Sequence, residues 1–162
     1  MSTYINNLTF IERTKKIVSG YKGEYDVSLI INACVGLLFM AKEKHHGILS
    51  AAKSEKILTK WGLNPSSIQF CGRYDHRQQK VVNQKIKLSS ICTHVRNSIA
   101  HCNFKTLPDS KKSKIEAILL RDFYVPHDKN KEPLMTFEAK INIDDFKKFI
   151  MAVADYILKK KQ

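Results

Sequence analysis

Long apolar runs are missing from this sequence, and their absence argues against a membrane protein. The most apolar stretch, residues 27–40, is shorter than the roughly 17 to 25 residues that a spanning helix needs, so it predicts a buried core helix. The N-terminus also lacks a cationic start followed by an apolar stretch, so no secretory signal is expected. We therefore expect a cytoplasmic protein with no membrane partner.

Cysteines are few, and no CxxC pair occurs among the four of them. The cluster that could be considered as a metal site consists of Cys92, His94, His101 and Cys102. Its spacings match no zinc pattern, and on a helix Cys92 and His94 would point about 200° apart. We therefore expect no metal and no cofactor, with reduced thiols in a cytoplasm.

Acidic residues are scarce as well. The sequence has 15 Asp and Glu but 28 Lys and Arg, which gives a formal charge of +13. A positive field of this size favours phosphate polymers, acidic proteins or anionic membrane surfaces as partners. A surface that only keeps the protein in solution is the alternative explanation. Charge therefore narrows the class of partner and locates no site.

Helical periodicity dominates most of the sequence. The length of 162 residues suits one domain, residues 1–162, and no linker long enough to divide it is present. A final helix begins with Asp144 as its N-cap and carries a clean apolar stripe as far as Ile157. Four further segments have apolar residues at helical spacing or on nearly all sides: residues 3–19, 26–47, 50–61 and 80–102.

From residue 118 onward the apolar period changes to two. Phe137, Ala139 and Ile141 alternate with polar residues, as in a half-buried strand, and residues 118–125 are its expected partner. Residues 64–79 are expected to be a solvated loop. The sequence therefore predicts a mainly α fold, a bundle of four to five helices with a small β-hairpin before the C-terminal helix.

Residues with catalytic potential gather at the end of the predicted helix 80–102. Arginine binds a phosphate bidentately and keeps its charge, whereas histidine exchanges a proton near neutral pH. On an ideal helix Arg96 and His101 lie about 140° apart, while Asn97 and His101 share a face. Arg96, His101 and Asn97 are therefore the candidate set for metal-free cleavage of RNA.

One copy of this set is incomplete for the reaction. Cleavage by attack of the 2′-hydroxyl requires a base, an acid and stabilisation of the charge on phosphorus. Two copies facing across a two-fold axis would supply both imidazoles, so we expect a homodimer with its interface along residues 80–102. The structural alternative is that Arg96 binds a carboxylate and His101 binds the last helix carbonyls. The other histidines, including His94, are expected to be solvated polar residues.

Residues 95–104, in which Asn directly follows Arg96, closely resemble the R-N-x-x-x-H motif of the HEPN superfamily (higher eukaryotes and prokaryotes nucleotide-binding). These are small all-helical domains. Residues 26–43 also look like the central helix of bacterial HEPN nucleases, and the resemblance extends loosely over most of the chain. Asn103 stands where some paired toxins of the superfamily have a Tyr, which argues against control by nucleotide modification of that Tyr.

The resemblance implies a metal-independent endoribonuclease that acts as a homodimer and leaves 2′,3′-cyclic phosphate ends. In that role Arg96 would bind the phosphate, His101 would transfer the proton and Asn97 would give polar support. The resemblance also implies a toxin or phage-defence effector, with an antitoxin or regulatory protein as a further partner. The alternative function is a non-catalytic basic helical module that binds nucleic acid or a partner protein.

Overall fold

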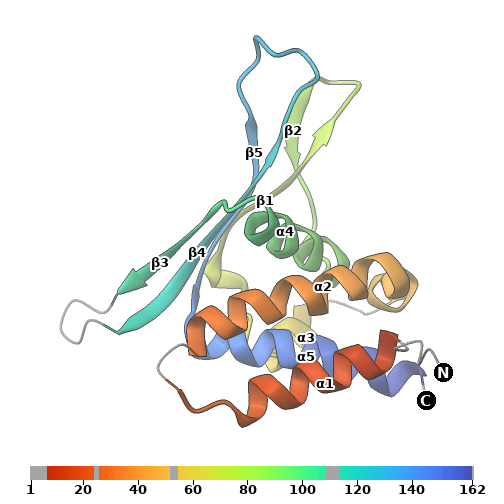
Figure 1. The fold of residues 1–162 in the computed structure, drawn as a ribbon. Helices are drawn as coiled ribbons and strands as arrows, with labels where there is room; N and C mark the ends of the chain where they lie inside the picture. The colour runs from red at the N-terminus through yellow and green to blue at the C-terminus, as the bar shows by residue number, and fades with distance from the viewer. Residues whose placement is uncertain (1–6, 24–25, 52–54, 109–113, 162) are drawn as a thin grey trace.

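The computed structural model describes residues 7–23, 26–51, 55–108 and 114–161. Within these ranges the chain combines α-helices, a short 3-10 helix and β-strands (Figure 1). In chain order they are α1 (Asn7–Gly20), α2 (Asp26–Ala51), α3 (Glu55–Lys60), η1 (Pro65–Ser67), β1 (Ile68–Asp75), β2 (Lys80–Asn83), α4 (Leu88–Ala100), β3 (Phe104–Pro108), β4 (Ile115–Tyr124), β5 (Leu134–Asn142) and α5 (Ile143–Lys161). In the described ranges, no helix has both the length and the apolar character needed to cross a membrane.

The described strands form one antiparallel sheet in the order β2-β1-β5-β4-β3. Its centre is the β4–β5 hairpin, in which Ala117 lies opposite Asn142 and Tyr124 lies opposite Leu134. The helices lie on one side of this sheet (Figure 1). α4 packs against β4, α5 packs against β4 and β5, and α2 contacts both α4 and α5. Helix α4 is therefore enclosed between the sheet and α2.

The core forms where the inward-facing apolar residues of the strands pack against the apolar faces of the helices. In β4, Ile118 and Leu120 are fully buried on the side that faces the helices. In α5, Phe146 and Phe149 are fully buried at helical spacing. Burying a side chain of this size contributes about 1.5 to 3 kcal/mol, so the contact between the hairpin and α5 is a main source of stability.

The prediction of a mainly α bundle is wrong, because a five-stranded sheet forms a whole layer of the described structure. Residues 68–75, expected as loop, form β1, and residues 80–83, expected as the start of a helix, form β2. A tight turn joins these strands: Asp75 Oδ1 accepts hydrogen bonds from the backbone N–H groups of Arg77 and Gln78 at 2.8 and 3.2 Å. Helix α4 consequently begins only at Leu88.

The expected hairpin is confirmed, because β4 pairs with β5 from Ile118 opposite Ile141 to Tyr124 opposite Leu134. The final helix is confirmed too, but its cap is Asn142 and not Asp144, because Asn142 Oδ1 accepts from the backbone N–H of Asp144 at 2.9 Å. The helices expected over residues 3–19 and 50–61 correspond to α1 and α3. Residues 3–6 and 52–54 lie outside the described residues.

Candidate functional site along helix α4

Helix α4 carries two stripes at helical spacing, one apolar and one polar. The apolar stripe is buried and packs the helix between α2 and β4; its members are Leu88, Ile91, Cys92, Val95 and Ile99. The polar stripe lines a cavity beside the sheet; its members are Ser90, Thr93, His94 and Asn97. The i, i+3, i+4 and i+7 spacing brings the second set onto one face of the helix. The sequence of α4 therefore places these polar side chains on the face that lines the cavity, and His94 is the buried member among them.

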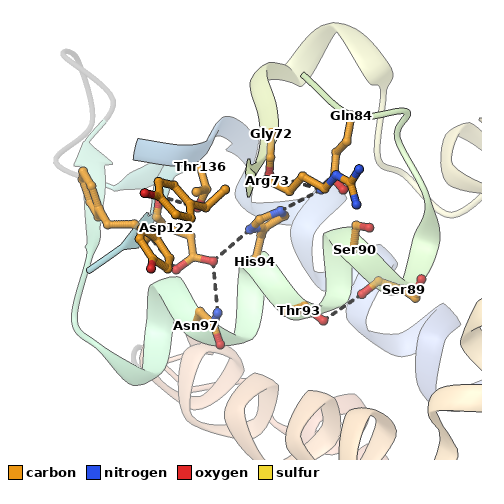
Figure 2. A pocket seen from close by; sticks show the side chains of 13 residues that line it. Gly72, Arg73, Gln84, Ser89, Ser90, Thr93, His94, Asn97, Asp122 and Thr136 are labelled. Atoms are coloured by element: carbon orange, nitrogen blue, oxygen red, sulfur yellow. Dashed lines mark hydrogen bonds and ion pairs between the residues drawn. The ribbon is translucent and has the colours of Figure 1, made fainter. Parts of the chain in front are cut away.

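His94 is the centre of a hydrogen-bond network between α4, β4 and the segment after β2 (Figure 2). Its Nδ1 lies 2.8 Å from Asp122 Oδ2, and its Nε2 lies 3.2 Å from the side-chain nitrogen of Gln84. Asn97 Nδ2 donates to the same oxygen of Asp122 at 3.0 Å. The other carboxylate oxygen accepts from the backbone N–H of Phe123 at 2.9 Å. Asp122 thus holds the side chains of His94 and Asn97 in place.

The environment of His94 favours the protonated ring. Burial by itself lowers the pKa of His94, but the hydrogen bond and charge of Asp122, with a further contribution from Cys71, raise this pKa to about 9. Phe137 stacks flat on the ring, with the ring centroids 4.9 Å apart. In the protonated ring both nitrogens are donors, so Gln84 must then turn its amide oxygen toward Nε2. The raised pKa of His94 accordingly favours an ion pair with Asp122 at neutral pH.

A cavity of about 350 Å³ opens beside this network, between α4 and strands β1, β4 and β5. We call it the α4 groove (Figure 2). It is lined by Gly72, Arg73, Tyr74, Gln84, Ser89, Ser90, Thr93, His94, Asn97, Asp122, Phe123, Tyr124 and Thr136. A pocket of this size with a few converging polar groups and a titratable residue of shifted pKa has the features of a binding site.

The three residues predicted from the sequence occupy different surroundings. Asn97 lines the α4 groove with its amide held by Asp122. His101 is exposed at the C-terminal end of α4, and its backbone N–H donates to the carbonyl of Asn97 at 2.9 Å. Arg96 is half-buried, and helical geometry turns it about 200° away from His94. Arg96 and His101 are thus positioned outside the lining of the groove.

A smaller cavity has a volume of about 220 Å³, and the residues that directly follow His101 in the chain form part of its lining. Its lining residues are Cys102, Asn103, Phe104, Lys105, Leu119, Arg121 and Phe123. Lys105 is exposed, while Arg121 Nε binds Glu138 Oε2 at 2.6 Å. The lining of this cavity therefore combines cationic and aromatic side chains.

The described residues include no group of three or more His, Cys, Asp or Glu placed to hold a metal. The set considered from the sequence is divided, because Cys92 and His94 are buried whereas His101 and Cys102 are exposed. Burial raises the pKa of Cys92 to about 12, and burial together with Cys92 raises the pKa of Cys34 well above its ordinary value. Both thiols are therefore neutral at physiological pH.

The expectation that His94 is a solvated polar residue is wrong, since its exposed fraction is 8%. The sequence did contain a sign that a histidine would be buried. Asp122 follows Ile118 and Leu120 at the inward positions of an alternating strand, and a carboxylate buried there needs a partner. His94 is 28 residues away along the chain, so only the fold identifies it as that partner.

The chain matches a known protein family. The family described as HEPN pEK499 p136 matches residues 1–162. The matched region includes both the segment with Arg96, Asn97 and His101 and all strands of the sheet. No curated protein and no solved structure matches the chain.

Proposed function

This chain belongs to the HEPN pEK499 p136 family, and from that membership and the geometry at the end of α4 we propose that it is a metal-independent endoribonuclease. The family is compatible with nucleotide binding or RNA cleavage. The cleavage reaction is attack of the 2′-hydroxyl on the adjacent phosphate, which leaves a 2′,3′-cyclic phosphate and a 5′-hydroxyl.

The observation that carries this proposal is the exposed imidazole of His101 at the C-terminal end of α4. The hydrogen bond from its backbone N–H to the carbonyl of Asn97 fixes its main chain at the C-cap of α4, and a defined position is what proton transfer to or from a bound substrate requires. Arg96, in the last turns of the same helix, is the proposed phosphate-binding cation. Its planar guanidinium suits two oxygens of one phosphate and the charge that develops on them.

Asn97 has a supporting role in this proposal. Its side chain is tied to Asp122 at 3.0 Å, and Asp122 is in turn bound to the buried His94. This network fastens the segment between Arg96 and His101 to strand β4. We therefore assign to Asn97 the positioning of the helix end, since its amide nitrogen is already engaged within the chain.

A second copy of the chain completes the chemistry, because one imidazole cannot be both the base at the 2′-oxygen and the acid at the departing 5′-oxygen in a single step. The flanks of α4 are covered by α2 and β4, whereas residues 100–102 are exposed. We place the two-fold contact of the proposed homodimer at this end of α4. There the two His101 side chains would reach one phosphodiester from opposite sides.

The test compares two exposed histidines. His101→Ala should lower the rate of RNA cleavage by about 10² to 10⁴, the usual contribution of one positioned acid or base. His127→Ala, in the exposed loop between β4 and β5, is the matched control and should cleave like the parent. Circular dichroism of both variants checks the fold. Activity of His101→Ala within about threefold of the control would contradict the assignment.

The metal requirement is tested separately in the presence of excess chelator, where full cleavage is expected. Loss of activity that returns with added zinc or magnesium would refute the metal-free mechanism. The biological role that we propose is that of a toxin or phage-defence effector. Growth arrest of bacterial cells that express the parent, and normal growth with His101→Ala, is the expected outcome.

A basic module that binds nucleic acid without cutting it is the second candidate, and the formal charge of +13 favours it independently of the motif. Such a module needs no proton-transfer residue. RNA binding by the parent without cleavage, and unchanged by His101→Ala, would identify this function.

A further inference from the structure

Cys71 of β1 lies beside the buried pair of His94 and Asp122. It is opposite Phe137 of β5, whose ring stacks on His94. The side-chain nitrogen of Gln84 is 3.6 Å from Cys71 Sγ and 3.2 Å from His94 Nε2, so one amide contacts both the sulfur and the ring. Asp122 binds Nδ1 on the other side of the ring at 2.8 Å (Figure 2). The fold thus brings a thiol, an imidazole and a carboxylate together from three different elements.

A thiol, an imidazole and a carboxylate in this order are the groups that activate a cysteine in many proteins. The imidazole holds the proton that the thiol gives up, and the carboxylate orients the ring and stabilises its charge. Burial lowers the pKa of His94, but Asp122 and, after it, Cys71 raise this pKa to about 9. The ring is therefore able to keep a proton beside the sulfur, and a thiolate next to an imidazolium is the reactive form of cysteine. The proposed cleavage of RNA makes no use of this group.

The burial of Cys71 limits the reagents that can reach it. Its exposed fraction is 8%, compared with 0% for Cys34 and 1% for Cys92. Gly72, which follows Cys71 in the chain, and His94 both line the α4 groove of about 350 Å³, so the groove comes close to the sulfur. Loss of water is costly for a charged reagent, and a large one does not fit beside a side chain this covered. Cys71 is therefore open to a small, uncharged reagent.

We propose that Cys71 is a site of reversible oxidation by hydrogen peroxide, with His94 as the acid for the departing oxygen and Asp122 as the residue that positions His94. The Cys71 thiolate attacks one oxygen of the peroxide, and the S–O bond forms as the O–O bond breaks. The sulfur loses two electrons, and the second oxygen leaves as hydroxide and takes the Nε2 proton of His94. The products are a sulfenic acid on Cys71, one water molecule and a neutral imidazole.

The oxidation is reversible because one small thiol converts the sulfenic acid into a mixed disulfide with loss of water, and a second thiol releases Cys71 from that disulfide. This modification site goes beyond the proposed cleavage of RNA and does not depend on it, since neither Arg96 nor His101 takes part.

The experiment treats the reduced full chain with hydrogen peroxide in the presence of dimedone, which labels sulfenic acids. Mass spectrometry of the peptides follows the labelling rate of each cysteine. Cys102 is the internal control, because it is exposed and exposure alone would make it react first. His94→Gln is compared with His127→Gln, which makes the same replacement at an exposed histidine. Circular dichroism checks that each variant folds, and cumene hydroperoxide is used as a bulky peroxide.

We expect Cys71 to be labelled about 10-fold faster than Cys102 or more, since an ordinary thiol is only a few per cent ionised at neutral pH. Dithiothreitol added before dimedone should remove the label. His94→Gln should slow the labelling of Cys71 by about 10-fold or more, as for the loss of a positioned acid, and should leave Cys102 unchanged. His127→Gln should behave like the parent. Hydrogen peroxide should act faster than cumene hydroperoxide.

Two outcomes would overturn the proposal. One is labelling of Cys71 in the parent that is no faster than that of Cys102, and this comparison decides the matter by itself if His94→Gln does not fold. The other is an unchanged rate for Cys71 in folded His94→Gln. Faster labelling by cumene hydroperoxide than by hydrogen peroxide would overturn the assignment of a small oxidant.

Discussion

The buried pair of His94 and Asp122 makes the stability of this protein depend on pH in a defined direction. The pKa of His94 is raised from 6.5 to about 9 in the folded chain. A raised pKa means that the folded state keeps a proton that the unfolded chain releases. The resulting stabilisation is fully present below about pH 6.5 and is lost as the pH rises through about 9.

The magnitude follows from the two pKa values. Their difference, at about 1.4 kcal/mol per pH unit, corresponds to about 3 kcal/mol of unfolding free energy. This is a large fraction of the roughly 5 to 15 kcal/mol by which proteins of this kind are stable. Because His94 and Asp122 are both buried, solvent screening reduces this value little.

The assay is urea unfolding of the parent and of His94→Gln between about pH 6 and pH 9.5. Gln can still donate to Asp122 and does not titrate, so the difference between the two proteins isolates the His94 proton from all other titrations. That difference should shrink by about 3 kcal/mol across the range. Cys71 also faces the ring, so the pair of measurements is repeated in a Cys71→Ser background.

The control is His127→Gln, which makes the same replacement at an exposed histidine away from the buried pair. A His94→Gln difference that stays constant within about 0.5 kcal/mol from pH 6 to pH 9.5 would refute the reasoning. It would mean that the folded protein holds His94 as a neutral ring, with Gln84 donating to it and Nδ1–H donating to Asp122.

Three further predictions concern other parts of the chain. Arg96→Lys should lose nearly as much RNA cleavage as Arg96→Ala, because an ammonium group cannot make the bidentate contact of a guanidinium; initial rates measure this, and full activity of the Lys variant would reduce Arg96 to a generic charge. RNA binding by His101→Ala should weaken steeply with added salt, as expected from counterion release by a chain of charge +13, and a flat salt response would point to protein partners. Gly62→Ala should lower the unfolding free energy by about 1 to 3 kcal/mol, because Gly62 has φ +93° and a Cβ there would lie 3.0 Å from the carbonyl of Asp145. Thermal unfolding tests this against Gly20→Ala, where the new Cβ meets nothing within 4 Å; equal stability of the two variants would count against strain at Gly62.

Local sequence patterns were sufficient to predict several of the helices and strands. The alternation around Phe137 and Ile141 predicted the β4–β5 hairpin, and the apolar stripe of residues 144–157 predicted α5, because period and face are properties of neighbouring residues. The string at residues 95–104 pointed to the HEPN superfamily, and the family match over residues 1–162 supports that membership. The catalytic roles of Arg96, Asn97 and His101 stay predictions.

The sheet beyond the hairpin was decided by tertiary structure. β1 contains the polar string from Arg73 to Asp75, which has no clear alternation, and it becomes a strand because β5 and β2 supply its hydrogen-bond partners. Partners of this kind lie far away in the sequence and leave no local period. Residues 80–83 were for the same reason mistaken for the beginning of a helix.

The candidate site also combines features that the sequence showed with features that only the fold showed. By itself the sequence determined that Arg96, Asn97 and His101 lie close together in the chain and that the chain is strongly basic, since both are properties of residue type and spacing. Only the tertiary structure decided that His94 is buried, that Asp122 binds it at 2.8 Å and that Asn97 joins the same carboxylate. Burial and long-range pairing depend on how α4 packs against β4, and that packing is a property of the whole fold.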